Sequence, residues 1–124
     1  MCTWTYQQST GRFYGPAGHF VARGYSGHGL GVNNPALEAD PGVGPIPAGL
    51  WTIGPPKTPP DHLGPCALPL TPDGFDPHGR TDFFMHGDFA GDTGELASRG
   101  CIVIGPEARL GVLASTIRQL KVIP

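Results

Sequence analysis

The sequence predicts a single, mainly β domain with one helix packed on it near the C-terminus. Short runs of alternating or wholly apolar residues recur along the chain, separated by segments rich in glycine and proline, and only one segment has helical periodicity. The 124 residues include 20 glycines and 15 prolines, so many loops must connect short elements. A chain of this length buries about two thirds of its surface in one core. The predicted domain therefore spans residues 1–124.

The N-terminal strands are predicted from alternation and turn residues. Apolar and polar residues alternate over residues 4–8, and a glycine turn then precedes a second short run at residues 12–14, which indicates a hairpin. A third strand is expected at residues 19–25. Glycine, proline and asparagine recur so often from residue 26 to 49 that we expect irregular surface structure there, and loops of this length are often functional.

The rest of the chain predicts five further strands and the helix. Residues 66–70 are expected to form an edge strand, because Pro69 cannot donate a hydrogen bond to a central ladder. Pro106 opens the predicted helix of residues 107–119, in which Leu110, Leu113, Ala114 and Ile117 recur at helical spacing. The other expected strands are residues 50–53, 82–86, 101–104 and 120–123, of which the second and third are short and apolar, as central strands are.

Charge and cysteine content exclude several classes of protein. The formal net charge is −2 and lysines and arginines never cluster, which excludes the electrostatic footprint of a nucleic-acid-binding protein. The N-terminus lacks the basic and apolar regions of a signal peptide, and no apolar run is long enough to insert into a membrane. Cys2, Cys66 and Cys101 are too few for a disulfide scaffold, and their odd number leaves at least one thiol outside any disulfide.

Cys101 and His86 form the candidate catalytic pair. Cys101 begins one predicted apolar strand, and His86 ends another, fifteen residues earlier. If these strands are neighbours, both side chains emerge at the same edge of the sheet, where an imidazole can act as the base for a nucleophilic thiol. Gly87 and Gly100 adjoin the pair and permit close approach of a substrate. Spacing alone favours the alternative, in which Cys101 is an inert core residue and His86 is structural.

These residues resemble a known family. His-Gly-Asp at residues 86–88 and Ser-Arg-Gly-Cys-Ile-Val at residues 98–103 are similar to the signature of YkuD-type L,D-transpeptidases. The likeness is closer to a divergent branch, the DUF2778 or Tlde1-like family of type VI secretion effectors. That branch also has Gly-Tyr-Ser-Gly, here residues 24–27, Asn-Asn-Pro, here residues 33–35, and Gly-Pro-Ile-Pro-x-Gly, here residues 44–49. Together these ordered motifs make the resemblance specific.

The resemblance implies a YkuD-like β-sandwich and cysteine acyl transfer on peptidoglycan stem peptides, without a cofactor. Cys101 would be the nucleophile that releases D-Ala from tetrapeptides, and His86 the base and later the acid. The Gly87 carbonyl would orient His86, and N–H groups near Gly100 and Cys101 would form the oxyanion hole. Water, a D-amino acid or a second stem would resolve the thioester, giving L,D-carboxypeptidase, exchange or L,D-transpeptidase activity.

The resemblance also implies a biological setting. The chain would be an antibacterial toxin that is made in the cytoplasm without a signal peptide, secreted, and active in the periplasm of the target cell. Its expected partners are peptidoglycan tetrapeptide stems and a cognate immunity protein, with no nucleic acid and no insertion into a membrane. The alternative functions are a zinc-dependent peptidoglycan peptidase and a non-catalytic cell-wall binding module.

The sequence departs from the wider family beside the catalytic cysteine. The usual His before the Gly-Cys pair is Arg99, and the usual Arg or Asn two residues after the cysteine is Val103. Arg99 is the candidate for binding the substrate carboxylate, with Arg80 as a second candidate, because a guanidinium can hold a carboxylate with two hydrogen bonds. The alternative for Arg99 is a solvated loop position. Ser98 either hydrogen-bonds within its loop or to His86, or is a plain turn residue.

The remaining candidates concern the substrate groove and a metal. Tyr25 and Asn33 are predicted to line the groove, with turn chemistry as the alternative. No pair of histidines has metal-ligand spacing such as HxxxH or HExxH. The one set considered for zinc is His78, His86 and Asp88. We therefore expect no metal site.

Overall fold

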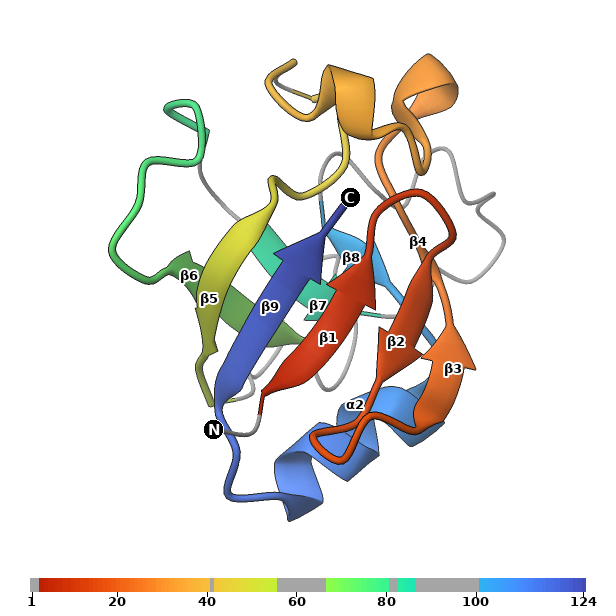
Figure 1. Ribbon diagram of the computed structural model, residues 1–124, viewed down its shortest axis with the longest axis vertical. Coiled ribbons are helices and arrows are strands. Elements are labelled where there is room, and N and C mark those ends of the chain that lie inside the picture. Colours follow the sequence, from red (N-terminus) through yellow and green to blue (C-terminus); the bar gives the residue numbers. More distant parts are fainter. Residues whose placement is uncertain (1–2, 41, 56–66, 81–82, 87–100) are drawn as a thin grey trace.

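The computed structural model describes residues 3–40, 42–55, 67–80, 83–86 and 101–124 (Figure 1). These residues form nine strands, one α-helix and two short 3₁₀ helices. The strands are β1 (Trp4–Gln7), β2 (Arg12–Tyr14), β3 (Phe20–Arg23), β4 (Tyr25–Ser26), β5 (Gly49–Ile53), β6 (Leu68–Pro72), β7 (Phe83–His86), β8 (Ile102–Val103) and β9 (Gln119–Ile123), and the helices are η1 (Gly29–Gly31), η2 (Pro35–Leu37) and α2 (Pro106–Ala114). The predicted mainly β fold with one helix near the C-terminus is confirmed. Within the described part of the chain, every helix is too short to span a membrane.

The strands belong to one continuous, nearly closed sheet with the order β3-β2-β1-β9-β5-β6-β7-β8-β4. A single stretch of chain supplies both ends of this order, since β3 pairs with β2 and β4 pairs with β8. Gly24 lies between β3 and β4, where a Cβ atom would collide with the Val103 carbonyl. The predicted third strand is therefore two strands, and the glycine allows the chain to pass from one end of the sheet to the other.

One face of the sheet forms the hydrophobic core. In β1 and β9 every second side chain is buried, as the sequence predicts from alternation. The indole of Trp51 is fully buried and meets the Phe83 ring edge to face, with centroids 4.9 Å apart. Burying each large apolar side chain of this kind stabilises the fold by roughly 1.5–3 kcal/mol. The core also encloses the Tyr6 ring, and burial raises the pKa of the Tyr6 hydroxyl.

The position of β6 differs from the prediction, because β6 lies between β5 and β7 and is not an edge strand. The Pro69 carbonyl accepts a hydrogen bond from the N–H of Gly54, just past the end of β5. On an antiparallel strand the N–H and C=O of one residue point to the same neighbour. The N–H that Pro69 lacks would therefore lie where β5 ends, so proline does not interrupt the ladder.

Helix α2 begins at Pro106 as predicted, but it ends at Ala114 rather than at residue 119. Ala108 and Val112 are fully buried, whereas Leu110 is 58% exposed. The helical spacing of Leu110 and Ala114 therefore does not mark the buried face, because both are exposed and the stripe that meets the core is set by Ala108 and Val112, one turn apart. The chain must leave the helix early, since β9 pairs with both β1 and β5 from Gln119 onward.

The segment between β4 and β5 is irregular, as predicted, but it is not confined to the surface. Pro45 and Ile46 are fully buried. The N–H of Ile46 donates to the Ser26 hydroxyl at 2.8 Å, and the Ile46 carbonyl accepts from Gln8 Nε2 at 2.8 Å. Because side chains satisfy its backbone, this part of the loop can lie in the interior.

Candidate functional site

Strands β7 and β8 are parallel neighbours, with Met85 opposite Ile102 and His86 opposite Val103. The condition on which the candidate pair depends, that its two strands are neighbours, is therefore met. Met85 and Ile102 belong to the hydrophobic core. Since successive side chains on a strand point to opposite faces, His86, Val103 and Cys101 share the other face of the sheet.

The register makes His86 and Cys101 diagonal neighbours. His86 ends β7 and Cys101 precedes β8, so in a parallel pair they share a face rather than an edge of the sheet. Along the strand direction the two residues are offset by only two positions, because β8 consists of two residues. With about 4.8 Å between strands and about 3.3 Å per residue along a strand, the two Cα atoms lie about 8 Å apart.

Both members of the pair are shielded from solvent. His86 is fully buried, and Cys101 keeps 9% of its exposure. Cys101 is a thiol rather than half of a disulfide. Only a small part of the Cys101 side chain therefore meets solvent.

Tyr25 lies on the same face as the pair. It is opposite Val103 in the antiparallel pairing of β4 with β8, so the sheet places it next to β8 on the side away from β7. Its side chain is half-buried. The structure thus brings one predicted groove residue, Tyr25, next to the strand that Cys101 precedes.

Asn33 stabilises β4 through hydrogen bonds with Ser26. Its backbone φ is 50°, its Oδ1 accepts from the N–H of Ser26 at 3.2 Å, and its own N–H donates to the Ser26 carbonyl at 2.9 Å. This is the turn chemistry that the sequence offered as the alternative to lining the groove. Asn33 therefore holds β4, and with it Tyr25, in place.

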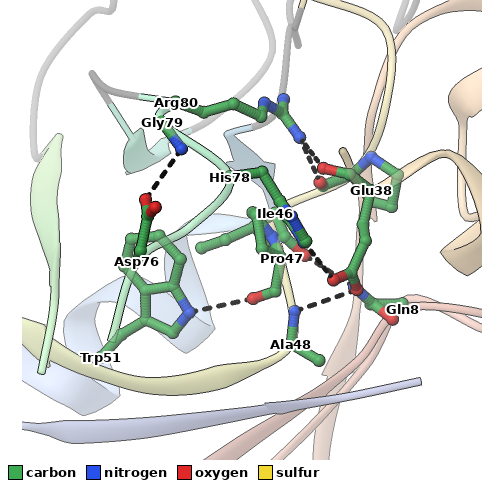
Figure 2. Close-up of polar contacts among 11 residues, drawn as sticks. Gln8, Glu38, Ile46, Pro47, Ala48, Trp51, Asp76, His78, Gly79 and Arg80 are labelled. Atoms are coloured by element: carbon green, nitrogen blue, oxygen red, sulfur yellow. Dashed lines mark hydrogen bonds and ion pairs between the residues drawn. The ribbon is translucent and has the colours of Figure 1, made fainter. Parts of the chain in front are cut away.

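Arg80 is buried beside the candidate nucleophile. Its Nη1 donates to the carbonyls of Glu38 at 2.5 Å and Pro45 at 2.9 Å, and its Nη2 donates to the carbonyl of Gly44 at 3.0 Å. The guanidinium also lies 5.1 Å from the centroid of the Phe83 ring. Figure 2 shows the Arg80 side chain reaching the backbone of the loop that contains Glu38.

The electrostatics connect Arg80 with Cys101. Burial lowers the pKa of Arg80, and negative charge on Cys101, Glu38 and Asp40 opposes this effect. The guanidinium and a negative charge on Cys101 therefore attract each other. Three backbone carbonyls occupy three of the five N–H donors of Arg80, and its binding of a substrate carboxylate remains a prediction.

Glu38 is a half-buried carboxylate whose contacts the sequence did not reveal. Its Oε1 accepts from Gln8 Nε2 at 2.9 Å and from the N–H of Ala48 at 3.2 Å, and its Oε2 lies 2.8 Å from His78 Nε2 (Figure 2). Burial alone would raise the pKa of Glu38, but the hydrogen bonds from Gln8, His78 and Ala48 and the charge of His78 together lower it. The carboxylate joins the loop before β5 to the chain after β1 and to the segment that leads to β7.

A match to a known family model covers both members of the candidate pair. The model of the Tlde1 domain matches residues 21–123, from β3 to β9, including both His86 and Cys101. The chain belongs to the Tlde1 domain family. The match confirms the resemblance to type VI secretion effectors that the motifs indicated. No curated protein and no solved structure matches the chain significantly.

The zinc candidates do not assemble in the described part of this Tlde1 domain. His78 interacts with Glu38, and its side chain is 44% exposed, whereas His86 is fully buried. Among the residues that the structure describes, no three His, Cys, Asp or Glu side chains form a group that could hold a metal ion. Asp88 lies outside those residues.

Four predicted site residues of the Tlde1 domain also lie outside the described residues: Gly87, Ser98, Arg99 and Gly100. Their roles in orienting His86, binding a carboxylate and forming the oxyanion hole remain predictions. Sequence reasoning underrated Arg80 and missed Glu38. Apart from Ala48, ten positions after Glu38, the hydrogen-bond partners of both side chains lie 30 or more positions away along the chain, so no local motif could reveal them.

Proposed function

We propose that this Tlde1 domain is a cysteine acyltransferase that acts on peptidoglycan stem peptides. The observation that carries the proposal is the register of β7 and β8, in which His86 is opposite Val103, two residues after Cys101. The buried charge of Arg80, which interacts with Cys101, supports it further. The motif resemblance supplies the substrate class, and the family supplies the setting of an antibacterial type VI effector.

The proposed reaction has two steps. His86 takes the proton of the Cys101 thiol, and the thiolate attacks the carbonyl carbon that precedes the terminal D-Ala. The tetrahedral intermediate collapses with cleavage of the C–N bond, and His86 returns the proton to the departing amine of D-Ala. The acyl group remains as a thioester on Cys101.

The second step releases the acyl group. Water, the amine of a D-amino acid or the amine of a second stem attacks the thioester carbonyl, and His86 takes a proton from this nucleophile. The C–S bond then breaks and Cys101 recovers its proton. The products are a shortened stem, an exchanged stem or a cross-link, respectively.

The decisive experiment is mass spectrometry of muropeptides after incubation with the protein. We expect tetrapeptides to lose D-Ala or to exchange it, while the glycan chains remain uncut. Cys101→Ala and His86→Ala should each abolish the activity, and the double variant should be no worse than either, because nucleophile and base act as one unit. Cys66→Ser is the matched control and should keep full activity.

Two outcomes would contradict the proposal. Loss of activity on treatment with a metal chelator would indicate a zinc peptidase, and labelling of Cys101 by a thiol reagent no faster than that of an ordinary buried cysteine would indicate a binding module. The proposed site of action is the periplasm of the target cell, with a cognate immunity protein as the partner that protects the producer.

A further inference from the structure

The outer side of β2 and β3 carries a groove of about 390 Å³ that lies apart from the catalytic pair. Arg12, Tyr14, Phe20 and Arg23 line it, and we call it the basic groove. Arg12 is opposite Arg23 in the ladder, and Tyr14 is opposite Phe20, with ring centroids 6.2 Å apart. Between these two pairs, Phe13 is buried in the core, so the groove residues of β2 lie on the other face of the strand.

The two arginines of the basic groove form an unfavourable pair within the protein itself. Like charges directly opposite each other on neighbouring strands repel. Arg23 Nε donates to the Thr10 carbonyl at 2.9 Å, which fixes the direction of its guanidinium. Within the described part of the chain, no carboxylate forms an ion pair with Arg12 or Arg23. Two exposed cations held together in a protein of net charge −2 suit an anionic ligand.

A short segment of the chain, residues 23–25, leads from the basic groove toward the catalytic pair. Arg23 ends β3 and Tyr25 begins β4, so their Cα atoms lie at most about 7 Å apart. Tyr25 is in turn opposite Val103, on the face that carries Cys101 and His86. Figure 1 shows β3 leading directly into β4 along one side of the molecule.

The dimensions fit an extended peptide. Cys101 lies two residues before Val103, the partner of Tyr25, so the Cα atoms of Cys101 and Tyr25 are about 8 Å apart. Arg23 lies at most about 7 Å beyond Tyr25. An extended tetrapeptide spans about 13 Å. A stem peptide whose scissile end is at Cys101 can therefore reach Tyr25 and the edge of the basic groove beyond it.

We propose that the basic groove binds free carboxylates of the peptidoglycan stem peptide while its scissile end occupies the site of Cys101. This inference rests on the proposed function and adds a second binding site to it. Guanidinium groups bind carboxylates with two parallel hydrogen bonds, and the rings of Tyr14 and Phe20 offer apolar surface to the aliphatic parts of the stem. The ligand's negative charge offsets the repulsion between Arg12 and Arg23.

Binding to the inactive full chain Cys101→Ala tests the proposal without turnover. The probes are a soluble disaccharide tetrapeptide and the same muropeptide with its carboxylates amidated. Adding Arg12→Gln and Arg23→Gln together should weaken binding of the first probe at least tenfold, to the level at which the amidated probe binds the unsubstituted groove. The single change Arg12→Gln is matched by Lys121→Gln, which removes an exposed cation from β9 and should leave the Kd unchanged.

Kinetics of the active protein separate this inference from the proposed function. In protein that retains Cys101, the two arginine changes should raise KM for D-Ala release and leave kcat nearly unchanged, because the groove does not touch the reacting atoms. Unchanged Kd and KM with normal D-Ala release would overturn the groove alone. Groove-dependent binding without release of D-Ala from any muropeptide would overturn the proposed function instead. Groove-dependent binding of polyglutamate, with no binding of the muropeptide, would assign the groove to an acidic protein partner and overturn the inference.

Discussion

Arg80 keeps a positive charge in a position where only 7% of the side chain is exposed. A buried cation is tolerated when its donors are satisfied, and three backbone carbonyls accept hydrogen bonds from this guanidinium. The same contacts hold residues 38–45 in place. A single side chain therefore fixes the loop before β5 and sets the charge near Cys101.

Replacing Arg80 should affect both stability and thiol chemistry. Arg80→Lys keeps the charge but loses the planar fork, so at least one buried carbonyl loses its donor, at a cost of about 1–3 kcal/mol in the free energy of unfolding. Urea unfolding measures this loss.

Arg80→Met also removes the charge, and alkylation of Cys101 at neutral pH should become slower than in Arg80→Lys. Arg12→Lys, at an exposed site, is the control. Equal stability of Arg80→Lys and the control would contradict the structural role.

Glu38 should make stability depend on pH in the acidic range. Its pKa in the folded state lies below the ordinary value of 4.5, so the carboxylate stabilises the fold. This contribution is fully present above about pH 4.5 and is lost as the pH falls through the lowered pKa of the folded state. The stability advantage of the native chain over Glu38→Gln should therefore shrink below about pH 4.5.

Urea unfolding of both chains across this range measures the Glu38 effect. Glu107→Gln, which replaces an exposed glutamate at the start of α2, is the control. An advantage over Glu38→Gln that stays constant from neutral to acidic pH would show that the Glu38 charge does not stabilise the fold.

At the scale of elements, the sequence predicted what alternation and turn residues control. Strands β1, β2 and β9 follow the predicted patterns because each exposes one face and buries the other. The central place of β6 could not be predicted, since it depends on where β5 ends beside Pro69. The buried face of α2 was likewise set by the tertiary partner and not by the residues with the strongest helical spacing.

In the candidate site too, the local sequence predicts some features and the tertiary structure sets the others. The short apolar strands that hold His86 and Cys101 were predictable, because such runs are typical of central strands. Their parallel register is a property of the assembled sheet. Because of it, the two residues share a face of the sheet and do not meet at one edge, as the sequence suggested. Gly24 was visible in the sequence as part of a motif, but its role in joining β3 to β4 is visible only in the closed sheet.

The arginine pair between β2 and β3 predicts a gain in stability on substitution. Arg12→Gln removes one of two like charges that are directly opposite in the ladder, so the free energy of unfolding should rise by about 0.2–1 kcal/mol. The gain should shrink at high ionic strength, because salt screens exposed charges. Urea unfolding at low and high salt measures it. Lys121→Gln, whose strand neighbours Thr5 and Leu50 are uncharged, should show no such gain. A salt-independent loss in Arg12→Gln would show that the repulsion is unimportant.

For the whole molecule, closure of the sheet assembles the site. The two-residue strand β8 is held by β7 on one side and by β4 on the other, and β4 is continuous with the far end of the sheet through Gly24. The hydrophobic core on the other face includes Met85 and Ile102. Cys101 and His86 are therefore positioned by the fold as a unit rather than by a local turn.

The proposed substrate leads to a prediction about compartments. Mature stem peptides lie outside the cytoplasmic membrane, so a chain that acts only on them should be tolerated when it is expressed in the cytoplasm of a bacterium. The same chain with an added periplasmic signal should cause swelling or lysis, measured as loss of optical density and of viable cells. Cys101→Ala, delivered in the same way, should be harmless in both compartments. Equal toxicity of the active chain in cytoplasm and periplasm would point to a cytoplasmic target and contradict the proposed substrate.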